Sequence, residues 1–78
     1  MKEKIEINKI GKIKQGNYLD WYVEVIDDTS GETGGFYINI FKNFDGKGEA
    51  YDNWLENFND VEEYFIDANW IIEWDVAS

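Results

Sequence analysis

The chain lacks histidine, cysteine and arginine altogether. These absences remove the usual general base, the thiolate nucleophile and the bidentate phosphate clamp. Two serines are present, Ser30 and Ser78, but no imidazole is available to activate either hydroxyl. Paired carboxylates remain as candidates for acid and base chemistry. That chemistry needs a cleft large enough for a substrate, which a fold of this small size rarely contains. We therefore expect a protein that is not an enzyme.

Without cysteine, neither a disulfide nor a thiolate-held zinc can stabilise the fold. The 78 residues make one domain, residues 1–78, of a size that buries only about 60% of the surface of its unfolded chain. The aromatic content of 18% is the expected substitute, because large rings build a dense core. No apolar segment has the length of a signal-peptide core or a membrane span. We expect a cytoplasmic protein without a membrane segment.

Positive charge is scarce, since seven lysines stand against 17 acidic residues and the net charge is −10. The imbalance is uneven: residues 1–16 hold five lysines and two glutamates, a net charge of +3, which leaves −13 for the remainder. From Gly48 onward there are nine acids and no base. This charge argues against direct nucleic-acid binding. It predicts a basic protein partner, or else an acidic surface that serves only solubility.

The spacing of apolar residues predicts an α+β fold in the order β-β-β-α-β, with an antiparallel four-stranded sheet and one helix packed on one face. Strict alternation predicts the two central strands, and the Gly-rich, acidic residues 28–35 predict a hairpin loop between them. The first strand changes phase, so we predict a bulge or break at Gly11. The four expected strands cover residues 5–15, 20–28, 36–41 and 70–76.

The expected helix starts after Asn53, a predicted N-cap that forms a capping box with Glu56. Asn69 is predicted to end the helix by adopting the left-handed backbone conformation. Trp70 and Trp74 are predicted core residues of the last strand, since large aromatics on an apolar stripe are usually buried. The helical stripe that is expected to pack on the sheet consists of Trp54, Phe58, Val61, Phe65 and Ala68.

The second face of the sheet is expected to lie open. Such a face is either a contact site or is covered by the first strand or by a second copy in a homodimer. Tyrosine anchors interfaces at little entropy cost, so Tyr22, Tyr37 and Tyr64 are predicted partner contacts. The expected residues of this face are Tyr22, Glu24, Ile26, Tyr37, Asn39, Phe41, Ile71 and Glu73.

Four acidic residues at helical spacing form a further candidate for partner binding. Steps of four, three and four positions align them on a helix, opposite the apolar stripe. Like charges at this spacing destabilise a helix by about 0.2–0.5 kcal/mol per pair, and no lysine is interleaved. Because the stripe lowers the stability of the helix, we expect it to have a function, which is partner binding. The alternative is that it only keeps the protein soluble. Its members are Glu56, Asp60, Glu63 and Asp67.

Two acidic loops have some features of cation sites, but we predict neither a metal nor a cofactor. Residues 43–54 place Asp45 and Gly48 at EF-hand offsets, yet Trp54 stands where the final bidentate glutamate belongs. Residues 27–32 are expected to form a flexible hairpin tip. Its three carboxylates, Asp27, Asp28 and Glu32, are therefore not predicted to bind a cation.

Three segments carry a resemblance to a known group of proteins: "GGFYINIF", "YDNWLENFNDVEEYF" and "WIIEW". In residue composition and in the order of secondary-structure elements, residues 20–75 resemble small acidic bacterial immunity proteins of polymorphic or contact-dependent toxin systems. The resemblance implies a toxin inhibitor that binds a cognate, often basic, nuclease domain and blocks its active site, with the acidic stripe and residues 27–32 facing the toxin. Two alternatives stay open: a phage-type nucleic-acid mimic whose carboxylates replace phosphates, and a self-associating structural module.

Overall fold

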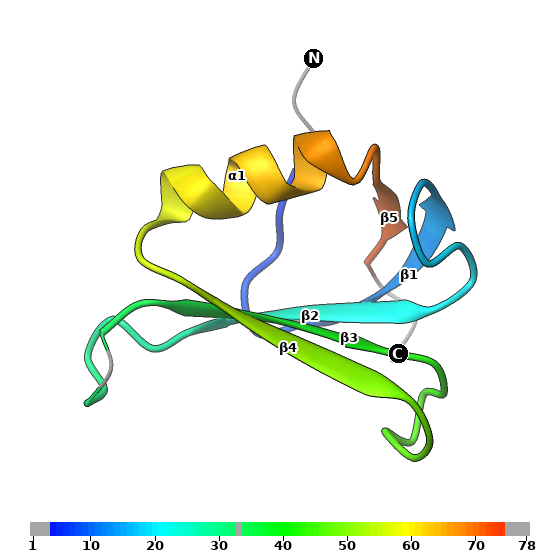
Figure 1. Cartoon of the computed structure of the whole chain (residues 1–78), viewed down its shortest axis with the longest axis horizontal. Coiled ribbons are helices and arrows are strands. Elements are labelled where there is room, and N and C mark those ends of the chain that lie inside the picture. The colour runs from blue at the N-terminus through cyan, green and yellow to red at the C-terminus, as the bar shows by residue number, and fades with distance from the viewer. Residues whose placement is uncertain (1–3, 33, 75–78) are drawn as a thin grey trace.

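The computed structural model describes residues 4–32 and 34–74, which form an antiparallel five-stranded sheet with one helix on one face (Figure 1). The strands lie in the order β4-β3-β2-β1-β5. The predicted α+β class is confirmed, but the sheet has one strand more than predicted. The elements are β1 (Ile10–Gln15), β2 (Tyr22–Asp27), β3 (Phe36–Phe41), β4 (Ala50–Leu55), α1 (Phe58–Asp67) and β5 (Ile71–Glu73).

Strands β2 and β3 form the centre of the sheet, as their alternation predicts. Val23 pairs with Ile40 and Val25 with Ile38, so four β-branched side chains point toward the helix. All four are almost completely buried. Branched side chains of this kind suit a pleated, buried surface, which explains why these two segments adopt strand conformation.

Strand β4 lies where the sequence pattern predicts a loop and the first turn of the helix, so that prediction is wrong. All six of its residues pair with β3, in a register that ends with Leu55 opposite Phe36. The ladder also packs Leu55 against the core. Trp54, predicted to be a core residue, instead faces away from the helix and is 47% exposed. Aromatic residues favour strands, and pairing with β3 outweighs a local helix-start signal of about 1 kcal/mol.

Helix α1 begins at Phe58, later than the predicted start after Asn53. Its N-cap is Asn57, whose side-chain oxygen accepts a hydrogen bond of 3.0 Å from the backbone N–H of Asp60. This bond satisfies one of the N–H groups that have no partner within a helix. The predicted left-handed end is confirmed, because Asn69 has a φ of 58°.

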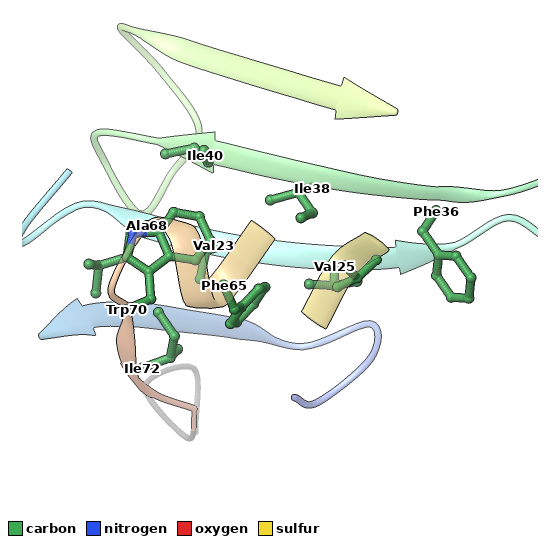
Figure 2. Close-up of a cluster of buried hydrophobic side chains, with 11 residues drawn as sticks. Val23, Val25, Phe36, Ile38, Ile40, Phe65, Ala68, Trp70 and Ile72 are labelled. Carbon is green, nitrogen blue, oxygen red and sulfur yellow. The ribbon is translucent and has the colours of Figure 1, made fainter. Parts of the chain in front are cut away.

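The core lies between α1 and the sheet, where Figure 2 shows the buried side chains gathered. Trp70 is buried as predicted, and its ring meets Phe65 edge-on with 4.9 Å between centroids. Trp74 is partly buried against the same cluster. Phe58, a predicted core residue, is exposed, and its ring packs edge-on against the ring of Phe36. The buried cluster comprises Ile13, Val23, Val25, Phe36, Ile38, Ile40, Val61, Phe65, Ala68, Trp70 and Ile72.

Gly11 does not break the first strand, contrary to the prediction. It lies inside β1, where a Cβ atom would collide with the side chain of Ile72 on β5. The register shift occurs instead between Ile13 and Gln15, and the chain bends before β1 at Asn8, which has a φ of 61°. In Figure 1 the segment before β1, in dark blue, rises from the sheet toward the helix layer.

The last strand keeps the predicted alternation over its three residues. Ile72 is buried, while Ile71 and Glu73 are exposed. Trp70 and Trp74, which the expected strand includes, lie outside β5, and its last two residues, Asp75 and Val76, lie outside the described residues. Because β5 pairs with β1 and β4 pairs with β3, the helix carries the chain from one edge of the sheet to the other.

Candidate functional site

The sheet face opposite α1, which we call the open face, carries side chains in three rows that run across the strands. The register of each ladder defines the rows. Because every second residue of a strand points to the same face, neighbouring rows lie about 7 Å apart. Two carboxylates thus lie between an aromatic row and an apolar row. The rows are Lys12, Tyr22, Phe41 and Ala50; Ile10, Glu24, Asn39 and Asp52; and Ile26, Tyr37 and Trp54.

Aromatic contacts hold the first row in place. Tyr22 stacks on Phe41 with 6.0 Å between ring centroids, and Phe44 packs edge-on against Tyr22 at 5.4 Å. The ammonium group of Lys12 lies 5.9 Å from the centre of the Tyr22 ring. As a result Phe41 is only 8% exposed although it faces away from the helix. Rings that are already ordered lose little conformational entropy when a partner covers them.

Trp54 is the largest side chain of the third row, and it was not predicted as a contact residue. It lies opposite Tyr37 in the ladder, and its indole crosses so close to Gly35 that a side chain there would collide with it. A half-exposed tryptophan is typical of interface hot spots. The signal that could have found it is the alternation of residues 50–55, in which Ala50, Asp52 and Trp54 share one face.

The middle row is negatively charged and is not neutralised within the described part of the chain. The salt bridges among residues 4–32 and 34–74 join Lys4 and Lys9 to Glu6, and neither Glu24 nor Asp52 takes part in one. Glu24 and Asp52 flank Asn39 on adjacent strands. The row can therefore accept hydrogen bonds from cations of a partner.

The predicted contact tyrosines are divided between the two sides of the molecule. Tyr22 and Tyr37 lie on the open face. Tyr64 instead lies on the helix side, with its ring 5.4 Å from that of Trp70 and its hydroxyl accepting a 3.3 Å hydrogen bond from the Asn53 amide. Burial raises the pKa of Tyr64, and so does the neighbouring phenol of Tyr18.

Tyr64 and Asp67, both predicted contacts, meet in a groove of about 260 Å³ at the end of α1. The indole N–H of Trp70 donates a 2.6 Å hydrogen bond to the carbonyl of Asn17, which ties the loop before β2 to the wall of the groove. The sequence pattern did not point to Tyr18, because its side chain reaches the groove from a distant turn. The lining residues are Asn17, Tyr18, Tyr64, Asp67, Ala68 and Trp70.

The structure shortens the predicted acidic stripe to three residues. Glu56 precedes the helix, whereas Asp60, Glu63 and Asp67 lie on α1. Glu63 and Asp67 are exposed, and Asp60 is half-buried beside its cap. Because α1 packs on the face opposite the open face, the stripe and the two sheet tyrosines do not form one surface.

The hairpin 27–32 closes beside the third row of the open face. The Asp27 carboxylate accepts hydrogen bonds from the hydroxyl and the backbone N–H of Thr29, at 2.6 Å and 2.9 Å. These two bonds, the hydroxyl first, lower the pKa of Asp27. Asp28 anchors the loop through its backbone, whose N–H donates to the carbonyl of Gly35 at 2.8 Å, and Glu32 is exposed.

Replacing Thr29 with valine is expected to raise the pKa of Asp27 toward its ordinary value of 3.8, because the stronger of the two hydrogen bonds is lost. In the wild type the folded-state pKa lies below the unfolded value. This stabilisation is therefore present above pH 3.8 and is lost as the pH falls through the folded-state pKa. A carboxyl NMR titration measures the shift. Thr29→Ser, which keeps the hydroxyl, should leave the pKa low, and an equal pKa in wild type and Thr29→Val would contradict the assignment.

Comparison with protein-family models, with curated proteins and with solved structures finds no significant match to this chain. Within residues 4–32 and 34–74, no three acidic side chains are grouped in a way that would hold a metal ion. No helix in that part of the chain is both long and apolar enough to cross a membrane. The features that the structure does bring together are the open face and the groove.

Proposed function

We propose that this protein binds a basic protein and inhibits it by covering the partner's working surface, in the manner of an immunity protein that neutralises a toxin. The observation that carries the proposal is the open face, where Glu24 and Asp52 lie between rows of aromatic and apolar side chains. A lysine or arginine of the partner that reaches this middle row would be surrounded by rings that exclude water.

Charge and aromatic surface contribute differently to such binding. The net charge of −10 speeds the encounter with a basic protein, an effect that salt screens. Once water is excluded, carboxylate–cation pairs inside the contact strengthen, and the rings of Tyr22 and Trp54 supply area for apolar and cation–π contact. An interface built in this way should stay bound at high salt, unlike one that rests on charge alone.

Affinity capture tests the proposal when two variants with the same charge change are compared. In one, Glu24→Gln and Asp52→Asn remove two carboxylates from the open face. In the other, Glu63→Gln and Asp67→Asn remove two from the helix. We expect the wild type and the helix variant to retain the same basic protein in 0.5 M salt, whereas the open-face variant binds it at least tenfold more weakly, because the partner's cations lose buried counterparts.

The remaining outcomes separate the alternatives. Loss of binding in the helix variant alone would place the contact on the acidic stripe and contradict the proposed surface. Capture of several unrelated DNA-binding proteins, all released by salt, would instead support a nucleic-acid mimic. A dimer of the isolated protein that dissociates when Trp54 is replaced by alanine would support self-association through the open face.

A further inference from the structure

We propose that the partner contributes an extended, basic strand that pairs with the outer edge of β4 and adds a sixth strand to the sheet. The inference rests on the proposed function, since it specifies how the basic partner is held. It follows from the backbone of β4, the charges along that strand and the size of the open face.

Strand β4 is hydrogen-bonded to the sheet on one side. In the sheet order β4-β3-β2-β1-β5 it is a terminal strand, and Figure 1 shows it along one border of the sheet. The opposite border is formed by β5, which has three residues, whereas β4 has six in uninterrupted register with β3. Among the described residues, β4 is thus the longer edge to which another strand could be added.

The register identifies which backbone groups of β4 point outward. The N–H of Lys42 donates to the carbonyl of Glu49 at 3.0 Å, at the start of the β3–β4 ladder. Hydrogen-bonded and non-hydrogen-bonded pairs alternate in an antiparallel ladder. The odd-numbered residues of β4 therefore bond to β3, and the N–H and C=O groups of Ala50, Asp52 and Trp54 face outward. Their side chains lie on the open face, so an added strand would widen that face.

Proteins usually protect such an edge with charged side chains, above all lysine, with proline or with a bulge. The sequence of β4, AYDNWL, contains neither residue, and its ladder with β3 has no bulge. Its one charged side chain is Asp52, and the nearest charged residues before and after the strand, Glu49 and Glu56, are also acidic. The edge is therefore regular in its backbone and negative in its charge, which suits a strand that carries lysine or arginine.

A second copy of this chain is a poorer occupant. The antiparallel pairing that brings together the outward-facing residues of two β4 strands, Ala50, Asp52 and Trp54, places Asp52 opposite Asp52 of the other copy, and like charges directly opposite each other destabilise a sheet. Each copy also carries a net charge of −10. A lysine or arginine opposite Asp52 forms an opposite-charge cross-strand pair instead.

The size of the open face also favours an extension at this edge. Three rows over four strands cover roughly 20 Å by 20 Å, about 400 Å², whereas a stable interface buries about 800 Å² on each partner. The contact has to continue past a border of the sheet. An added strand supplies that area next to Asp52 and Trp54, together with backbone hydrogen bonds.

Amide hydrogen exchange measured by NMR tests the pairing with a defined probe, the peptide KTVTKTVTK. Its spacing sets valines opposite Trp54 and Ala50 and the central lysine opposite Asp52. In the free protein we expect fast exchange at Asp52 and Trp54 and slow exchange at the odd-numbered residues of β4. Saturating peptide should slow exchange at Asp52 and Trp54 at least tenfold. The same peptide with glutamates in place of lysines, or N-methylated at its valines and central lysine, should have no effect.

Two substitutions at one position provide the matched control. Asp52→Ala and Asp52→Pro both remove the carboxylate, but only proline removes the outward N–H, and neither removes a hydrogen bond to β3. The alanine variant should bind the peptide several-fold more weakly yet still show slowed exchange at Trp54, whereas the proline variant should show none. Thermal unfolding of both variants checks that they fold. If proline prevents folding, the N-methylated peptide decides the same question on the wild type.

Three results would overturn the inference: equal peptide binding by both Asp52 variants, slowed exchange without the alternation along β4, or slowed exchange at higher protein concentration without peptide, which would indicate self-pairing. The proposed function is judged separately. If a captured basic protein binds Asp52→Ala and Asp52→Pro equally well, edge pairing fails while the basic-partner proposal stands. If the wild type retains no basic protein in 0.5 M salt, the proposed function fails.

Discussion

Replacing Phe65 with alanine is expected to lower the free energy of unfolding by about 3–5 kcal/mol. The ring is 3% exposed, meets Trp70 edge-on at 4.9 Å and lies nearly parallel to Trp74 at 6.3 Å. Truncation would leave a cavity where the helix packs on the sheet. A chain of 78 residues has a total stability of about 4–12 kcal/mol, so this one change removes a large fraction of it.

Urea denaturation followed by tryptophan fluorescence measures the effect as a lower midpoint with an unchanged slope. Ile66→Ala is the matched control, because the neighbouring side chain on the same helix is 60% exposed and its loss should change stability by no more than about 0.5 kcal/mol. Similar losses for the two variants would mean that Phe65 is not buried between helix and sheet.

Replacing Gly16 with alanine is expected to lower the stability by about 3 kcal/mol or more. Gly16 has a φ of 98°, and the left-handed region costs an L-residue about 1–2 kcal/mol. A Cβ atom would in addition collide with the backbone carbonyls of Ala68 and Asn69. The backbone cannot easily move away, because the N–H of Asn17 donates a 3.0 Å hydrogen bond to the carbonyl of Ala68.

Gly46→Ala separates the two causes. Gly46 also has a positive φ, 79°, but no atom lies within 4 Å of the position that its Cβ would take. This control should therefore show the conformational cost alone, about 1–2 kcal/mol. In a domain of this size, the melting temperature falls by about 4–8 °C for each kcal/mol of stability that is lost. The melting temperatures of the two variants should therefore differ by several degrees. Equal melting temperatures would show that Gly16 does not contact the end of the helix.

Local spacing predicted the parts of the fold whose burial repeats regularly. Strands β2 and β3 alternate without interruption, and their predicted faces match the ladder that pairs them. The buried part of the helical stripe, Val61 and Phe65, and the left-handed Asn69 also agree with prediction. These features depend on residue type and a fixed period, so one segment is enough to indicate them.

The residues around Trp54 could not be assigned in the same way. Asn53 with Glu56 has the form of a helix start, and Trp54 continues the spacing of the helical stripe, yet the same residues alternate as a strand. Pairing with β3 decides between the two, because it adds a full ladder of hydrogen bonds and places Leu55 against the core. The misplaced helix start in turn put Glu56 on a stripe to which it does not belong.

The candidate site shows the same division. That Tyr22 and Tyr37 share an outward face followed from alternation within β2 and β3. That Trp54 extends their face did not, because it requires the register of β4. The groove between Tyr18 and Tyr64 joins the turn before β2 to helix α1, far apart in the chain, and no local pattern connects them.

The sequence by itself determined the strong negative charge, the absence of histidine, cysteine and arginine and the alternation of the central strands, because these properties belong to residue types and their spacing. Only the tertiary structure decided that Glu24 and Asp52 lie in one row, that aromatic and apolar rows flank them and that β4 presents an outer edge. Each of these depends on which strands pair and in what register. That choice is made by the burial of the whole core, which no single segment of the chain contains.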